Sequence, residues 1–342
     1  RGEAGHAGFA APGQPAEPGQ AGWAHPTVPP PQGWVWPASG GLVPADPYGY
    51  GHPYGWYPAG AGWDPNDPLV TPPHAGFGGW FSRCTGAFRR GWRLLLPIML
   101  LTQVVPGAAL SALALALGPS SQVGTGPDGA PVRPDDYFQG VAAILGVAFV
   151  GSLLIGLVQS LGWAAGTWVV TRQAAGEPVA LGPALRYGLR RALGLWGWTL
   201  LVSVLMGVGL CFCVLPGIYL AFALSLTGPV YLFERENPIG RSFRIFHQRL
   251  GPVLGRVALV AAVVILGSMV GGVLEQVGLL PFGDRPLAAP GAGVGALAVV
   301  VLAAALVAPV YLVQLVGLLA TYAEHRAHEG PVNSARLAAE LG

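Results

Sequence analysis

The sequence predicts an all-α membrane protein: a polytopic helical bundle with about six transmembrane helices and three basic amphipathic interfacial helices, preceded by a disordered Pro/Gly-rich tail. Three observations predict this class. The 342 residues are 52% hydrophobic and only 10% charged, whereas soluble domains carry about 25% charged residues. The apolar residues form long uncharged blocks, each about as long as a helix that crosses a bilayer. Between these blocks, arginines alternate with large apolar side chains at helical spacing.

The first domain, residues 1–78, is expected to be a disordered cytoplasmic tail. It holds 16 Pro and 16 Gly and only six charged residues, so it cannot bury enough apolar area to offset the loss of chain entropy. Its many Trp and Tyr residues fit either a spacer or a docking segment for protein partners. Nucleic-acid binding is not expected, because Arg1 is the only Arg or Lys before Arg83 and phosphate binding depends on cationic contacts.

The membrane domain, residues 79–323, contains six apolar stretches of spanning length. The fourth is the shortest, and a Leu215–Ile218 hinge is expected to join it to the third. Pro106 predicts a kink within the first, and residues 324–342 are expected to form a polar cytoplasmic tail. The predicted spans are 94–117, 141–170, 193–214, 218–233, 253–280 and 294–322.

Three basic amphipathic segments, 81–96, 176–193 and 241–249, lie next to the spans. In the third, Ile239, Phe243, Phe246 and Leu250 form the expected apolar stripe, and Arg241 is placed on the wet face. Such helices lie in the headgroup layer, with their arginines near anionic lipid. Their similarity fits either an internal repeat or convergence on one physical need. The candidate lipid-headgroup contacts are Arg89, Arg93, Arg186, Arg190, Arg241, Arg244 and Arg249.

The arginines also predict the orientation of the chain. With six spans, fifteen arginines fall on one side of the membrane, and Arg133 and Arg285 fall on the other. Because Lys and Arg are retained on the cytoplasmic side, both termini are expected to be cytoplasmic.

A few polar residues interrupt the apolar stretches. Gln159, Glu275 and Gln314 are candidates for an intramembrane polar path. The alternatives are interhelical hydrogen bonds for Gln103, Gln159 and Gln314. For Glu275 they are contact with water near the end of its span or a helix–helix hydrogen bond. Metal ligation is the weaker interpretation of two other pairs. Packing is favoured for Cys211 and Cys213, and solvation in the polar tail for His325 and His328.

The central hairpin resembles a known family. Its pattern is a Leu-Pro-Gly-Ile hinge, a Pro and then a Glu at the exit of the short span, and a Ser-aromatic-Arg basic helix. This is similar to the membrane domain associated with bacterial glycerophosphoryl diester phosphodiesterases, and to related six-span actinobacterial, Streptomyces-like membrane proteins. The residues that carry the resemblance are Leu215, Pro216, Gly217, Ile218, Pro229, Glu234, Ser242, Phe243 and Arg244.

The resemblance implies the membrane domain, its topology and a location in the bacterial plasma membrane, but not hydrolase activity. The His-Arg-Gly opening of the hydrolase domain is missing, because His325-Arg326 is followed by Ala327. Phosphate-loop, nucleophile-elbow and zinc-protease motifs are also missing. We therefore expect no enzyme and no cofactor. Two hypotheses follow: a membrane-organising module that interacts with proteins or lipids, and a small-molecule or lipid transporter that uses the polar path.

Overall fold

The computed structural model describes residues 34–35, 43–44, 63–117, 134–234, 236–283 and 286–341. The chain divides into two units, Arg1–Ala61 and Gly62–Gly342. In the first unit, β1 (Trp34–Val35) pairs antiparallel with β2 (Val43–Pro44), with Trp34 opposite Pro44. Most of the predicted disordered tail lies outside the described residues, but its last part, residues 63–78, is described.

The second unit is helical, and six of its helical segments are long and apolar enough to cross a membrane. The predicted fold class is therefore confirmed, and the chain is a multi-pass membrane protein. The helices are α1 (Gly76–Met99), the π-helical turn η1 (Leu100–Val104), α2 (Val105–Leu117), α3 (Pro134–Ala174), α4 (Leu181–Phe212), α5 (Val214–Ala223), α6 (Thr227–Phe233), α7 (Pro238–Gln248), α8 (Leu250–Leu279), the 3₁₀ turns η2 (Leu280–Phe282) and η3 (Pro286–Ala288), α9 (Pro290–Glu329) and α10 (Ser334–Leu341).

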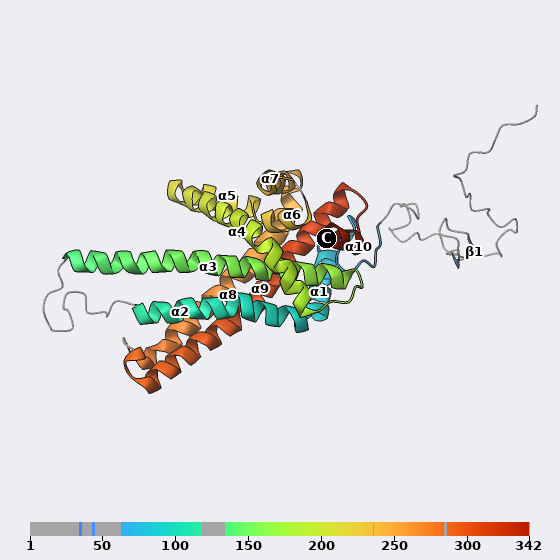
Figure 1. Ribbon diagram of the computed structural model, residues 1–342. Helices are drawn as coiled ribbons and strands as arrows, with labels where there is room; N and C mark the ends of the chain where they lie inside the picture. Colours follow the sequence, from blue (N-terminus) through green and yellow to red (C-terminus); the bar gives the residue numbers. More distant parts are fainter. Residues whose placement is uncertain are drawn as a thin grey trace, which may run out of the picture. The chain divides into compact units, whose positions relative to one another are not determined.

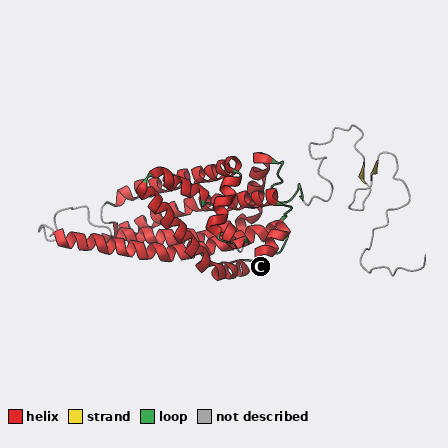
Figure 2. Ribbon diagram, turned by 90° about the horizontal axis from the view of Figure 1, so that it is seen from above, coloured by secondary structure: helices red, strands yellow, loops and turns green. Residues whose placement is uncertain are grey.

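Several of these helices are much longer than a bilayer requires. α3 has 41 residues and α9 has 40, which at 1.5 Å per residue gives about 60 Å, against a hydrocarbon core of about 30 Å. Figure 1 shows α1, α6, α7 and α10 gathered at one end of the unit, where the C-terminus also lies. Figure 2, turned by 90°, shows the helices running alongside one another from that end.

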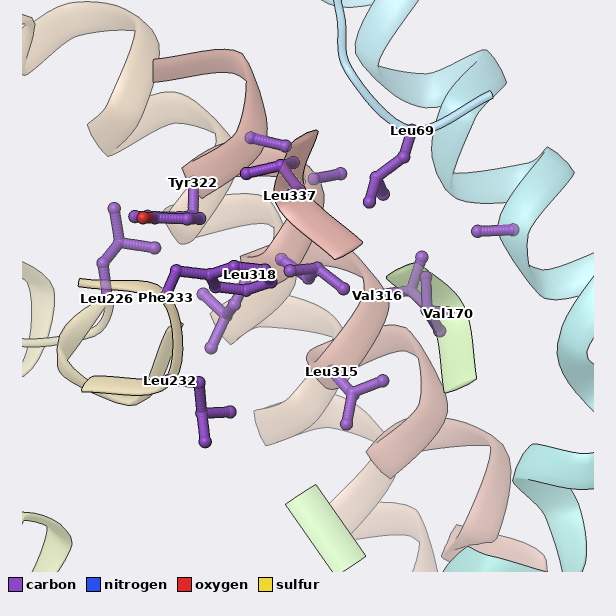
Figure 3. Close-up of a cluster of buried hydrophobic side chains, with 14 of the residues drawn as sticks. Leu69, Val170, Leu226, Leu232, Phe233, Leu315, Val316, Leu318, Tyr322 and Leu337 are labelled. Atoms are coloured by element: carbon purple, nitrogen blue, oxygen red, sulfur yellow. The ribbon is translucent and has the colours of Figure 1, made fainter. Parts of the chain in front are cut away.

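The packed core lies at this same end. We call residues 63–99, 160–195, 223–260 and 312–341 the head, because every member of the main buried hydrophobic cluster falls within them. Figure 3 shows part of this cluster, in which Tyr322 stacks on Phe233 with ring centroids 5.2 Å apart. We call the remaining residues between 100 and 311 the far half of the unit. There, large apolar side chains such as Phe149, Ile265 and Leu302 are exposed, as expected for a surface that faces lipid.

The three basic segments fold in two ways. The first two are continuous with the spans that follow them, in α1 and α4. The third is the separate helix α7, which begins with Asn237 accepting a hydrogen bond from the Ile239 amide (3.1 Å) and ends at Arg249 (φ −140°, ψ 53°). Figure 1 views α7 nearly end-on while α3 runs across the view, so α7 lies across the direction of the spans. This orientation is the one predicted for a helix in the interface.

The α4–α5 hairpin turns earlier than predicted. Cys213 alone separates the two helices, in an extended conformation (φ −168°, ψ 147°), whereas Pro216 and Gly217 lie in the first turn of α5. Proline is tolerated there because the first amides of a helix have no intrahelical partner. Gly217 permits close approach of α4, since a Cβ at this position would meet the Leu210 side chain and lie 2.9 Å from its amide nitrogen.

At the position of the predicted kink, the helix contains the π-helical turn η1, which ends at Val104, two residues before Pro106. The Val105 amide donates to the Leu100 carbonyl. Within η1, Gln103 Nε2 donates to the Gln159 carbonyl of α3 at 3.1 Å. The predicted interhelical hydrogen bond is thus confirmed for Gln103, although its partner is the backbone of Gln159.

Both predicted boundaries of the membrane domain need correction. Residues 63–75, here called the linker, are ordered on the head, and Leu69 is fully buried. Asp67 accepts hydrogen bonds from the Ser334 amide (2.7 Å) and hydroxyl (2.5 Å) and so caps α10. The ordered unit therefore begins before residue 78. Residues 324–341 are likewise not a free polar tail, because Glu324 and Leu337 are buried in the head.

Candidate functional site

Four of the predicted headgroup contacts are exposed arginines of the head. Arg89 and Arg93 are exposed on α1, and Arg186 and Arg190 are exposed on α4. We call these four residues the arginine surface.

Exposed apolar side chains accompany the arginine surface on both helices. Phe88 and Trp92 are exposed on α1, and the Arg93 guanidinium lies 5.7 Å from the centre of the Trp92 ring. On α4, Leu189 and Leu193 are each 68% exposed. Cations beside apolar side chains match the boundary between lipid headgroups and acyl chains.

Two further predicted contacts, Arg244 and Arg249, differ in exposure. Arg244 is exposed, and its Nη1 lies 3.6 Å from Glu236 Oε2. Arg249 is half-buried where α7 meets α8. An exposed pair such as Arg244–Glu236 contributes little to stability, so Arg244 is still able to reach another anion.

The prediction that Arg241 lies on the wet face of α7 is wrong. Arg241 is 9% exposed, and its Nε donates to Glu234 Oε2 at 2.7 Å. Its Nη1 donates to Glu329 Oε1, also at 2.7 Å. The buried face of α7 comprises Pro238, Arg241, Ser242, Ile245 and Phe246. Arg241 thus faces the head, because two carboxylates there compensate for the loss of its hydration.

These residues belong to a larger group that joins four segments of the chain. Glu234, at the end of α6, also accepts a hydrogen bond from the Tyr322 hydroxyl (2.9 Å). Arg326 of α9 donates to Glu340 of α10 at 2.9 and 3.0 Å, and its Nη1 lies 3.7 Å from Glu234 Oε1. We call Glu234, Arg241, Tyr322, Arg326, Glu329 and Glu340 the charge cluster.

The charged residues of this cluster line a cavity of about 390 Å³ in the head. Hydrogen bonds to Glu329 and then to Glu234 raise the pKa of Arg241 above its usual range, although burial acts in the opposite direction. Arg241 is therefore always charged. Each of Glu234, Glu329 and Glu340 accepts a hydrogen bond from an arginine. This arrangement suits a fixed clamp between helices better than proton transfer, which needs a group that is free to change its protonation state.

A second buried ion pair connects α8 and α9. Arg256 Nη2 donates to Glu324 Oε1 at 2.5 Å, and both side chains are buried. His325, expected in a solvated tail, is buried with its Nε2 3.2 Å from Glu329 Oε1. His328 Nε2 lies 4.0 Å from Glu324 Oε1. Across the part of the chain that the structure describes, no group of three His, Cys, Asp or Glu residues could hold a metal ion.

The candidate polar path is not assembled. Gln159, Glu275 and Gln314 are all half-buried, on α3, α8 and α9. Val307 of α9 approaches Gly271 of α8, so Gln314 lies roughly 11 residues, or about 16 Å, beyond the level of Glu275 along α9. None of the three lines the cavity in the head or an apolar groove of about 400 Å³ between α8 and α9.

The three cysteines lie in two different places. Cys211 and Cys213 are exposed at the turn of the α4–α5 hairpin, and Cys84 is half-buried on α1. Among residues with described side chains, Glu275 is the one charged residue in the far half; the others lie in the head. Among these residues, the charge is therefore concentrated in the head.

Sequence reasoning missed the charge cluster and the role of Asp67. The one available signal was the spacing of Glu234 and Arg241 on either side of the turn into α7. Glu329, which pairs with Arg241, and Ser334, which pairs with Asp67, lie far from their partners in the sequence. Comparisons of the chain with protein-family models, with curated proteins and with solved structures found no match.

Proposed function

We propose that this chain is a non-enzymatic integral protein of the bacterial plasma membrane that holds anionic lipid at its cytoplasmic surface and so serves as a membrane-organising module. The observation that carries the proposal is the arginine surface, in which four exposed guanidinium groups lie beside exposed Phe, Trp and Leu side chains on α1 and α4. The proposal includes a cytoplasmic location for both termini, because fifteen arginines of the sequence are expected on one side of the membrane and Arg is retained in the cytoplasm.

Electrostatics supports this role for the exposed arginines rather than for the buried ones. Each basic residue near an anionic leaflet contributes about 1 kcal/mol of attraction. Arg241 and Arg326 already have carboxylate partners inside the head. The arginines of α1 and α4 lie outside that cluster, on helices that continue directly into apolar spans.

A transporter that uses Gln159, Glu275 and Gln314 is the less favoured alternative. Its candidate residues are separated along the spans, and the head cavity and the groove between α8 and α9 are lined by other residues. The resemblance of the central motif to a membrane domain agrees with either role.

The test is to change Arg89, Arg93, Arg186 and Arg190 together to Gln and to quantify the lipids that copurify. The proposal expects a several-fold loss of bound phosphatidylglycerol and cardiolipin, because four of the contacts that attract them are removed. The control is Arg336→Gln, an exposed arginine of the head that is not among the predicted headgroup contacts and already has a carboxylate neighbour. Unchanged anionic lipid in the quadruple variant, in a protein that still folds, would contradict the proposal.

A further inference from the structure

The turn of the α4–α5 hairpin contains no charged residue, unlike the connections before α3 and before α9, which also lie in the far half. From residue 192 to residue 233 the sequence contains no Asp, Glu, Lys or Arg, and it is apolar throughout residues 210–218. By contrast, the connection before α3 contains Asp128 and Arg133, and the connection before α9 contains Asp284 and Arg285. A turn that emerges into water is normally polar, since exposed loops have to solvate their backbone.

The hairpin tip also presents large apolar side chains outward. Phe212 is 86% exposed, Leu215 is 74% exposed and Val214 is 60% exposed. In water, three such neighbours would form an apolar patch of the kind that soluble surfaces avoid. Among acyl chains the same exposure is favourable.

The length and direction of α4 limit how far the tip can reach. Arg191 is its last charged residue, and 21 residues follow up to Phe212, or about 31 Å of helix. That length equals the hydrocarbon thickness only for a helix perpendicular to the membrane. In Figure 1, α4 and α5 run obliquely away from α3, and their tip ends before the far end of α3.

The backbone of the turn suits a surrounding without water. Only Cys213 lies between the helices, and its amide donates to the Gly209 carbonyl at 3.1 Å. Pro216 brings no amide to the first turn of α5. The turn therefore leaves fewer unpaired backbone groups than a longer loop would, which lowers the cost of placing it in hydrocarbon.

We propose that the α4–α5 hairpin is re-entrant: its tip, residues 210–215, stays among the acyl chains and does not reach the opposite aqueous phase. The hairpin enters from the side of the head and returns to it. The chain then crosses the membrane completely four times, through α1–α2, α3, α8 and α9. The proposal requires the membrane location of the chain but not lipid binding at the arginine surface.

The two cysteines at the tip make the test direct. A nitroxide spin label is attached to Cys213 of the full chain carrying Cys84→Ala and Cys211→Ala, reconstituted in phosphatidylcholine–phosphatidylglycerol vesicles. Collision rates with oxygen, which concentrates in hydrocarbon, and with a water-soluble nickel chelate are then measured. Labels introduced instead at positions 285 and 244 give the reference values for the two aqueous sides.

A re-entrant tip predicts a high collision rate with oxygen and a collision rate with nickel several-fold below both references. Nickel access equal to that at position 285 would show that the tip emerges into water and would overturn the proposal. Low access to both reagents would overturn it in another way, because the tip would then be covered by protein, such as a second copy of the chain. Labelling yields of native Cys211 and Cys213 with a membrane-impermeant maleimide, before and after detergent, give an independent measurement on the unmodified chain.

Discussion

Arg241 holds the segment that follows the α4–α5 hairpin against the C-terminal end of α9. Its guanidinium bridges Glu234 and Glu329, and the side chains of Arg241 and Glu234 are only 10% and 11% exposed. At this degree of burial, the arrangement depends on every charge having a partner. Removal of the cation leaves two carboxylates that are poorly hydrated and repel each other.

Arg241→Gln should therefore destabilise the protein by about 2 to 4 kcal/mol, somewhat below the cost for a fully buried pair because Glu329 is partly hydrated. The measurement is the apparent melting temperature of the detergent-solubilised protein, which should fall by several degrees. Arg244→Gln is the matched control on the same helix, and it should change stability by less than about 1 kcal/mol because its pair is exposed. Equal melting temperatures for the two variants would show that the charge cluster does not stabilise the head.

The basic residues themselves could be found from the sequence, but their sorting into exposed and buried could not. Arg241 and Arg244 occupy the same short amphipathic helix, and local periodicity placed both on its wet face. Their different environments depend on Glu329, which lies 88 residues from Arg241. One sequence, without covariation, does not show such a contact.

At the scale of elements, the linker and α10 stabilise each other. The Asp67 carboxylate accepts hydrogen bonds from the Ser334 amide and hydroxyl and from the amides of Leu69 and Val70. It therefore fixes the turn of the linker and the N-terminus of α10 with one carboxylate. An eight-residue helix is too short to be stable alone, so α10 depends on this cap and on the burial of Leu337 and Leu341.

Asp67→Ala should loosen both elements. It removes a helix cap, which costs about 0.5 to 2 kcal/mol, and it leaves buried amides without an acceptor, which adds about 1 to 3 kcal/mol. The measurement is limited proteolysis from the head side: cleavage in residues 330–341 should become markedly faster than in the parent protein. Asp64→Ala serves as the control, since Asp64 accepts one exposed local hydrogen bond from Asn66. Equal cleavage rates in both variants would mean that α10 is held without Asp67.

Elements that form from local information were predicted well, and elements held by distant contacts were not. The six apolar segments and α7 were found because length, apolar content and helical periodicity are local properties. The linker and α10 were assigned to tails because Pro-rich or polar composition normally signals a lack of burial. Their order comes from Asp67 and Ser334, 267 residues apart.

At the scale of the whole molecule, the described residues of the second unit divide into a charged, well-packed head and a far half whose surface is mostly apolar. Helices of about 60 Å extend through both. The sequence predicted the spans but not the head, because the charges near each span were interpreted as isolated interfacial helices and tails. In the structure they pack together and make one cytoplasmic-facing body in the proposed orientation.

Single cysteines introduced into a chain without native cysteines test this polarity most directly. Cysteines at positions 128 and 285 should react with a membrane-impermeant thiol reagent on intact cells, because they belong to the far side of the spans. Cysteines at positions 186 and 244, both exposed on the head, should react only after the membrane is permeabilised, because the positive charge retains the head in the cytoplasm. Reaction at position 186 or 244 on intact cells would contradict the account, since the head would then face outward.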